Sequence, residues 1–353
     1  MLASTTPAIA ALILLVTVIG FIAYARGNRT AARPELGSEM ELAANRTPYY
    51  DDEVLEGRRL ERVQFIGLLF LVVSVVGLPL YWVLEPSRQA GATQYSKDRA
   101  IGWGRTLFEP TANGGFNCAG CHGGMKATGG VADYAVTDPS TQQVTSVKWN
   151  APALNTVLYR FSEDEVKFIL VYGRPFSPMS PWGLDGGGPM NAQQIETLIA
   201  YLRSIQIPRV GCAANEPDPL DCATGTLDID QQAEISKRAQ QLVDEGKYKS
   251  VGEALFNLDL AAGAFSCARC HTQGWSYGKP AVSGSGAMGP NLTGGATDKH
   301  FQSEQDMIDA IKKGSEVGKK FAAQGQGSGR MPGFGNMLTD EQIKLIVEYV
   351  RSL

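Results

Sequence analysis

Two long apolar stretches near the amino terminus interrupt an otherwise mixed pattern of hydrophobic and polar positions. They cover residues 8–25 and 64–84, and neither contains a charged side chain. At a helical rise of about 1.5 Å per residue, each stretch is long enough to cross most of the hydrocarbon core of a bilayer. We therefore expect two transmembrane helices in contact with lipid. Pro79 should kink the second helix without ending it.

The basic residues between these stretches predict how the two helices are oriented. The segment 26–63 contains seven arginines, whereas no Lys or Arg precedes residue 8. Because basic residues are enriched on the cytoplasmic side, this segment is predicted to be a cytoplasmic loop. Residues 1–93 then form the anchor of a multi-pass cell-membrane protein, and the rest of the chain lies on its outer side. A signal peptide is the alternative for the first stretch, which lacks the basic segment and small-residue cleavage site of such peptides.

Beyond the anchor, the apolar positions follow a helical period, and the pattern occurs twice. Apolar side chains spaced i, i+3, i+4 and i+7 follow polar residues that are typical helix caps. We call residues 94–206 the first repeat and residues 246–353 the second repeat, and we expect both to be helical. The caps fall into two matching pairs, Ser162 with Ser303 and Asn191 with Thr339.

Four of the six cysteines belong to two copies of one motif. Cys118-Ala119-Gly120-Cys121-His122 and Cys267-Ala268-Arg269-Cys270-His271 both read C-x-x-C-H, the attachment pattern of haem c. Two thiols on one helical turn can add to the two vinyl groups of haem, and the adjacent imidazole can then bind the iron. A zinc site or a thioredoxin-like site would use similar residues, but neither explains why the surrounding sequence is repeated.

Each repeat resembles a class I cytochrome c domain. The resemblance rests on an early Gly and Phe, the haem motif, a proline loop, a late methionine and a terminal aromatic helix. It implies an all-α protein, with an amino-terminal two-helix transmembrane hairpin followed by two tandem cytochrome c domains. It further implies two covalently attached haem c groups, close helix crossings and proximal loops. The crossings would place Gly104 against Tyr201 and Gly252 against Tyr349, and the loops would contain Pro152 and Pro290.

The axial ligands of the second haem follow from its motif and from the family pattern. His271 is expected on one side of the iron. Met331 is expected on the other, since Met331-Pro332-Gly333-Phe334 matches the Met-Pro-x-Phe pattern of the family.

In the first repeat, His122 is the expected proximal ligand, and two methionines compete for the opposite side. Met179 is our choice, because an aromatic residue follows three positions later, as it does after Met331. Ser180 replaces the proline of the family pattern, which leaves Met190 as the alternative. His300 lies in a polar stretch, and we expect it to be solvated rather than bound to iron.

The remaining cysteines, Cys212 and Cys222, lie between the repeats and are not followed by histidine. On the outer side of a membrane, such a pair is expected to form a disulfide. The surrounding residues 207–245 are therefore interpreted as a linker with a disulfide. The acidic side chains of residues 207–230 suggest a solvated linker, with an acidic contact patch as the alternative.

Composition and motifs together favour electron transfer over catalysis. The chain has 353 residues, a formal net charge of -4 and a pI near 5.6, so it lacks the basic surface of a nucleic-acid-binding protein. Two haems with both axial positions filled would leave no iron site for substrate. A nearby group of basic residues could steer an acidic redox partner toward the second haem, although a merely solvated surface is the alternative. These are Lys312, Lys313, Lys319 and Lys320.

The order of anchor and haem motifs resembles the di-haem subunit of cbb3-type oxidases. The di-haem subunit of actinobacterial bcc menaquinol:cytochrome c reductases has similar domains. This resemblance implies a relay between quinol:cytochrome c reductase and terminal cytochrome c oxidase, as a subunit of one of these complexes. The alternatives are a di-haem cytochrome c peroxidase and the haem subunit of a periplasmic dehydrogenase.

Overall fold

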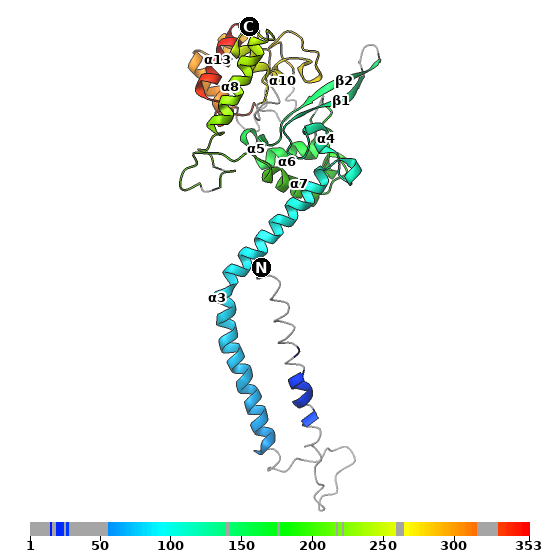
Figure 1. Ribbon diagram of the computed structural model, residues 1–353, viewed down its shortest axis with the longest axis vertical. Coiled ribbons are helices and arrows are strands. Elements are labelled where there is room, and N and C mark those ends of the chain that lie inside the picture. Colours follow the sequence, from blue (N-terminus) through cyan, green and yellow to red (C-terminus); the bar gives the residue numbers. More distant parts are fainter. Residues whose placement is uncertain are drawn as a thin grey trace, which may run out of the picture. The chain divides into compact units, whose positions relative to one another are not determined.

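The computed structural model describes residues 15, 19–24, 26–27, 56–137, 142–174, 177–216, 218–220, 222–258, 265–315 and 331–353. The chain divides into two compact units, Met1–Ala92 and Thr93–Leu353, and each is described by itself. Most of the described residues are helical (Figure 1).

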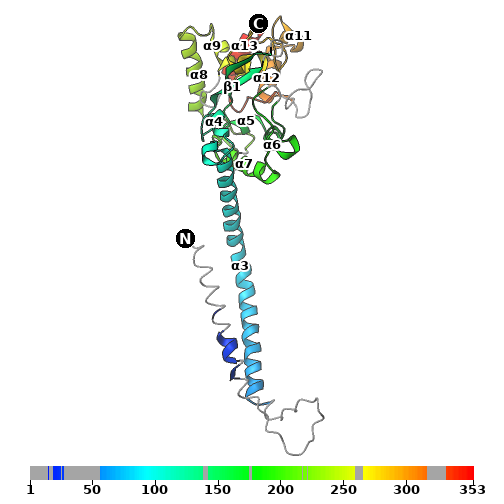
Figure 2. The ribbon, with the colours of Figure 1, turned by 90° about the vertical axis from the view of Figure 1, so that its right-hand side faces the viewer.

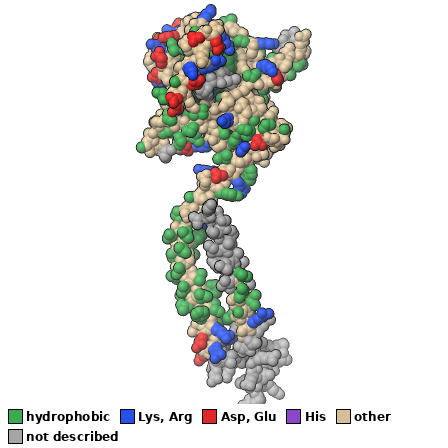
Figure 3. Space-filling view, in the orientation of Figure 1, with side chains coloured by type: hydrophobic (Ala, Val, Ile, Leu, Met, Phe, Trp, Pro, Cys, Tyr) green, Lys and Arg blue, Asp and Glu red, His purple; other side chains and the backbone are tan. Residues whose placement is uncertain are grey.

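One long helix, α3 (Arg58–Phe108), provides most of the described residues of the first unit, and its carboxy-terminal end belongs to the second unit. Its apolar stretch includes the predicted span 64–84 and exposes large hydrophobic side chains such as Leu68 and Phe70 (Figure 3). Exposed apolar side chains are compatible with lipid. Among the described residues, α3 is the one helix long and apolar enough to cross a membrane.

The helix continues through its prolines, because both Pro79 and Pro86 lie inside α3. The other predicted span, 8–25, falls largely outside the described residues. Of its positions, Leu15 and residues 19–24 are described, and they are helical.

The second unit contains both repeats and two hydrophobic cores. The first repeat comprises the end of α3, then η2 (Thr111–Asn113), α4 (Cys118–His122), β1 (Gly130–Thr137), β2 (Val144–Ala151), α5 (Val157–Arg160), α6 (Glu163–Tyr172), η3 (Leu184–Gly186) and α7 (Ala192–Ser204). α8 (Ile229–Asp244) follows. The second repeat comprises α9 (Val251–Asn257), α10 (Ala268–His271), η4 (Trp275–Tyr277), α11 (Ala296–His300), α12 (Glu304–Lys313) and α13 (Asp340–Arg351).

Glycine allows the first and last helices of each repeat to touch. α9 packs against α13 (Figure 2), and a Cβ atom on Gly252 would lie 2.1 Å from the carbonyl oxygen of Leu345. α3 contacts α7 in the same way, since a Cβ atom on Gly104 would lie 1.9 Å from the carbonyl oxygen of Thr197. Both crossings bring an aromatic pair together, with ring centroids 5.3 Å apart for Phe108–Tyr201 and 5.5 Å apart for Phe256–Tyr349.

The four predicted helix caps are confirmed, and each is a complete capping box. In every case the cap side chain accepts from the backbone N–H three residues later, and that residue's side chain accepts from the cap N–H. Both hydrogen bonds satisfy backbone donors that a helix start leaves unpaired. The boxes are Ser162 with Glu165, Asn191 with Gln194, Ser303 with Asp306 and Thr339 with Gln342.

The all-α expectation is wrong in one place, since the first repeat contains a β-hairpin. β1 and β2 pair antiparallel from Gly130 opposite Ala151 to Thr137 opposite Val144. Both strands are rich in the β-branched and aromatic residues that favour extended structure, and the rings of Tyr134 and Trp149 lie 6.2 Å apart. The hairpin separates the first haem motif from the proline loop.

The segment between the repeats contains buried apolar side chains as well as the acidic ones that suggest a solvated surface. It includes the helix α8, whose side chains Ile235 and Ala239 are buried in the core of the second repeat. Leu227 is also fully buried, and its N–H donates to the carbonyl oxygen of Asn336 at 2.7 Å. Buried apolar side chains therefore tie this segment to the second repeat.

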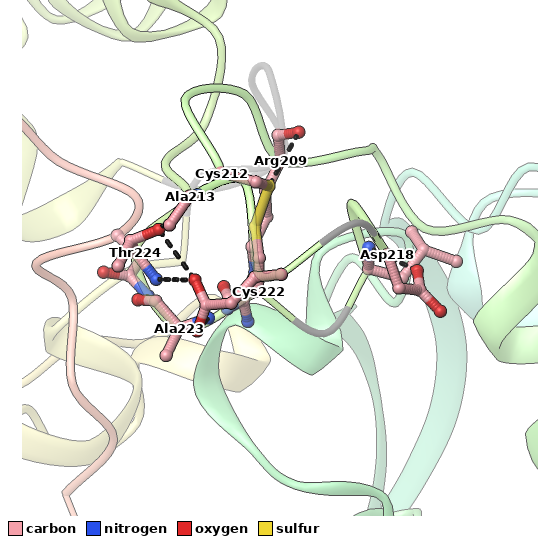
Figure 4. Close-up of a disulfide and its surroundings, with 10 residues drawn as sticks. Arg209, Cys212, Ala213, Asp218, Cys222, Ala223 and Thr224 are labelled. Atoms are coloured by element: carbon pink, nitrogen blue, oxygen red, sulfur yellow. Dashed lines mark hydrogen bonds between the residues drawn. A yellow bond between two sulfur atoms is a disulfide. The ribbon is translucent and has the colours of Figure 1, made fainter.

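The predicted disulfide between Cys212 and Cys222 is confirmed (Figure 4). Their Cα atoms lie 5.7 Å apart, within the usual range for a disulfide. The guanidinium of Arg209 donates to the carbonyl oxygens of Cys222 at 2.6 Å and of Leu158 at 2.8 Å. Arg209 thus links the disulfide loop to the first repeat.

Candidate functional site

The four motif cysteines are not in disulfides, and all are partly buried. Cys118 and Cys121 lie on the single turn of α4, three positions apart and so on one helix face. Burial raises the pKa of the Cys118 thiol to about 11 and that of Cys267 to about 12, and it also raises the pKa of Cys270. Burial therefore favours the uncharged form of these three thiols.

Both motif histidines are held by a proline carbonyl group. The Nδ1 atom of His122 lies 2.8 Å from the carbonyl oxygen of Pro152, and that of His271 lies 2.9 Å from the carbonyl oxygen of Pro290. Because a carbonyl oxygen only accepts, Nδ1 must carry the proton, which leaves Nε2 with the lone pair that binds a metal. Burial lowers the pKa of both histidines and so favours the neutral form that can act as a ligand.

The loops that contain Met179 and Met331 have the same backbone geometry. In each repeat a glycine with positive φ ends the preceding helix, Gly173 at 70° and Gly314 at 71°. The next residue then donates its N–H to the methionine carbonyl oxygen, at 2.8 Å for Met179 and 2.9 Å for Met331. A side chain at either glycine would meet that carbonyl group, so the sequence needs glycine there.

The aromatic residues that follow the two methionines also occupy matching places. The N–H of Trp182 donates to Leu170 at 2.9 Å, and the N–H of Phe334 donates to Ile311 at 3.0 Å. In both repeats the donor lies three residues after the methionine and the acceptor three residues before the glycine. Met179 is therefore the structural counterpart of Met331.

The two candidate methionines of the first repeat lie in different surroundings. Met179 is partly buried and lines a cavity of about 1100 Å³. Met190 is fully buried in the hydrophobic core and is not among the residues that line this cavity. The sulfur of Met179 is thus better placed than that of Met190 to reach a ligand there.

The cavity brings together the expected haem-binding residues of the first repeat, which are Cys118, Cys121, His122, Pro152 and Met179. Two thiols, an imidazole and a thioether match the donor set of a haem c with histidine and methionine on its iron. The volume suits a cofactor-sized ligand. The residues present therefore fit a haem.

The wall of the cavity also includes parts of the second repeat that the sequence did not indicate. Arg269 and Cys270 of the second motif line it, as do Trp149 of β2 and Tyr277 of η4, whose ring centroids lie 5.8 Å apart. Such contacts depend on how the repeats pack, and no local sequence pattern predicts them. The first site is therefore closed partly by the second repeat.

Three other residues considered from the sequence, His300, Lys312 and Lys313, do not line this cavity. His300 is exposed and packs its ring edge against Phe301, as expected for a solvated histidine. Lys312 forms an ion pair with Asp340 at 2.8 Å, and Lys313 is exposed. Lys319 and Lys320 lie outside the described residues.

Comparison with known proteins identifies one domain. Residues 251–353 match the family described as cytochrome c, and this range contains Cys267, Cys270, His271 and Met331. No curated protein and no solved structure matches the chain. The second repeat is a cytochrome c domain, which implies covalently bound haem c and electron transfer.

Proposed function

We propose that this chain is a membrane-anchored di-haem cytochrome c that relays electrons in a respiratory chain. Residues 1–93 would anchor it through spans at 8–25 and 64–84. The haem domains, residues 94–206 and 246–353, would lie on the outer side of the membrane. The relay would run between quinol:cytochrome c reductase and cytochrome c oxidase, with the chain as a subunit of one of these complexes.

One observation supports the haem that this proposal assigns to the first repeat. The family match covers only the second repeat, yet the first repeat has the same histidine–proline hydrogen bond and the same methionine loop. Two sequences that hold a histidine and a methionine in the same backbone settings are suited to the same cofactor.

The chain's residues would have distinct roles around each haem. When bound, the haem supplies an iron centre that gains and loses one electron. The cysteines would hold the porphyrin through thioether bonds, and the proline carbonyl groups would fix the histidine rings. Met179 and Met331 would fill the remaining axial positions, and a thioether there raises the reduction potential. Filled axial positions favour electron transfer over peroxide turnover.

The haem count is the direct test. The mass of the purified, denatured protein should exceed that of the polypeptide by two haems. Cys121→Ala and Cys270→Ala should each weaken covalent attachment in one repeat only, whereas Cys212→Ala, outside the motifs, should leave both haems attached. A wild-type protein with one covalent haem would contradict the di-haem proposal.

Membership in a respiratory complex needs a separate experiment. The chain should co-purify with reductase or oxidase subunits from mildly solubilised membranes, and quinol should reduce its haems in that preparation. Co-purification with a dehydrogenase, or rapid peroxide turnover by the isolated protein, would instead favour one of the alternative functions.

A further inference from the structure

Two exposed aromatic side chains on α6 form a feature that the haem chemistry does not use. Phe168 and Tyr172 are 50% and 48% exposed, and their ring centroids lie 4.8 Å apart. They are four residues apart and therefore share one face of the helix. The opposite face contains Val166, Ile169 and Leu170, which line the cavity of the first repeat. α6 therefore separates the aromatic pair from the proposed haem site.

The second repeat offers an internal comparison for this face. Its helix α12 is the counterpart of α6, because both helices begin at a capping box, run for 10 residues and end at a glycine with positive φ. At the two positions that match Phe168 and Tyr172, α12 has Asp309 and Lys313, and both are exposed. Charged side chains are usual on a solvated helix face. Exposed rings at the same positions of the same fold mark the α6 face as a contact surface.

A third exposed apolar side chain lies beside α6. Leu184 of η3 is 63% exposed. η3 packs against the end of α6, and a Cβ atom on Gly186 would lie 2.1 Å from the carbonyl oxygen of Val171. We call Phe168, Tyr172 and Leu184 the α6 patch. Its aromatic side chains are of the kind enriched at the centres of protein interfaces.

Exposed carboxylates lie next to the α6 patch. Asp164 is exposed and lies four residues before Phe168, on the same face of α6. Asp185 is also exposed and directly follows Leu184. α6 contains one base, Lys167, and it pairs with Glu196. The α6 patch therefore combines an apolar centre with an acidic edge.

The charge at this edge selects among the possible occupants. Acidic side chains are repelled by the anionic headgroups of a lipid surface. A two-fold contact between two copies of this chain would bring the same carboxylates face to face. We propose that the α6 patch docks a partner protein whose apolar contact surface is edged by lysine or arginine side chains.

The proposed function gives this partner a role. Because α6 lies between the patch and the cavity, a redox protein docked there would exchange one electron with the first haem. That exchange rests on the proposed function, whereas the docking itself does not.

The test is the binding of a lysine-rich monohaem cytochrome c to the full-length haem protein in detergent, measured by calorimetry at low salt. The double variant Phe168→Asp/Tyr172→Lys replaces both rings with the residues that α12 has at the matching positions, so the net charge stays the same. We expect it to weaken binding about tenfold. Asp164→Asn/Asp185→Asn should weaken binding about threefold, and this difference should vanish at high salt.

Two controls make the result specific. Asp309→Asn removes a charge from the matching face of α12 and should leave binding unchanged. Acetylation of the lysines of the probe removes their charge and should weaken its binding to the wild type. Equal affinities of the wild type and the Phe168→Asp/Tyr172→Lys variant would overturn this inference, as would a wild type that does not bind the lysine-rich probe.

The other occupants give different results. If the Phe168→Asp/Tyr172→Lys variant loses self-association, or binding to phosphatidylglycerol vesicles, with unchanged affinity for the probe, the patch belongs to a second copy or to lipid and the inference is wrong. A wild type with one haem that still binds the probe through the patch would overturn the proposed function and leave the docking surface in place.

Discussion

The glycine at the crossing of α3 and α7 gives a sharp test of the first repeat. In Gly104→Ala, the new Cβ atom would lie 1.9 Å from the carbonyl oxygen of Thr197 and 2.8 Å from the Cβ atom of Tyr201. Ordinary contacts between heavy atoms are about 3.5–4.0 Å. The obstacle is backbone, so it cannot rotate away, and α3 and α7 must move apart.

The magnitude follows from two opposing effects. Overfilling a packed contact costs about 1–3 kcal/mol, and an overlap with backbone belongs at the upper end. Replacing glycine by alanine inside a helix stabilises the helix by about 1 kcal/mol. The net loss should be about 2 kcal/mol, and the buried Phe108–Tyr201 ring pair should loosen with it.

Gly102 provides the matched control, because it lies on the same helix and a Cβ atom added there would meet nothing within 4 Å. Gly102→Ala should stabilise the protein by up to about 1 kcal/mol, so the two variants should differ by about 3 kcal/mol. Guanidinium unfolding of the haem protein, followed by far-UV circular dichroism and haem absorbance, measures both. Equal midpoints for Gly104→Ala and Gly102→Ala would refute the packing argument.

Three further predictions concern ligation, the disulfide and pH. Met179→Ala should allow carbon monoxide to bind the first haem, which absorbance spectra detect. Met190→Ala should lower the stability of the hydrophobic core and leave that haem unable to bind carbon monoxide. The opposite pattern would make Met190 the axial ligand. Cys222→Ser should lower the free energy of unfolding by about 3 kcal/mol in the chain-entropy description. Chemical reduction of the disulfide in the wild-type protein should lower it by as much. In the chain without haem, burial lowers the pKa of the two motif histidines, so its unfolded state binds protons that its folded state does not. The free energy of unfolding should therefore fall as the pH drops through about 6.5, and denaturant midpoints that stay constant there would contradict this.

Features that depend on short stretches of sequence could be predicted well. The capping boxes at Ser162 and Thr339 need only residues three positions apart, and the C-x-x-C-H motifs need only five residues. The glycines Gly173 and Gly314 were not predicted to matter, although each follows a predicted helix and precedes a candidate methionine. Glycine at that point is a signal for a helix end that the sequence does contain.

Features that depend on packing were missed for physical reasons. Hydrophobic and polar residues alternate only weakly along the hairpin, because alanines such as Ala132 and Ala135 interrupt its β-branched residues. The resemblance to cytochrome c domains also favoured helices there. Acidic side chains around residue 220 masked the burial of Leu227. Trp149 and Tyr277 both line the first cavity because two distant parts of the chain pack together, and such contacts leave no local pattern.

The side chains between the repeats have a consequence for modularity. Tyr159 of the first repeat is buried in the core of the second, and Arg160 lies 4.5 Å from the ring of Phe265 and 3.8 Å from the sulfur of Met337. A cut within residues 207–245 would therefore expose an aromatic side chain and an arginine from one side, and core apolar surface from the other. The sequence suggests two independent repeats. A fragment that contains only one repeat would nevertheless expose this buried apolar surface and would be prone to aggregate. Replacing either repeat with a cytochrome that binds one haem would require redesign of the surface on which the two repeats pack.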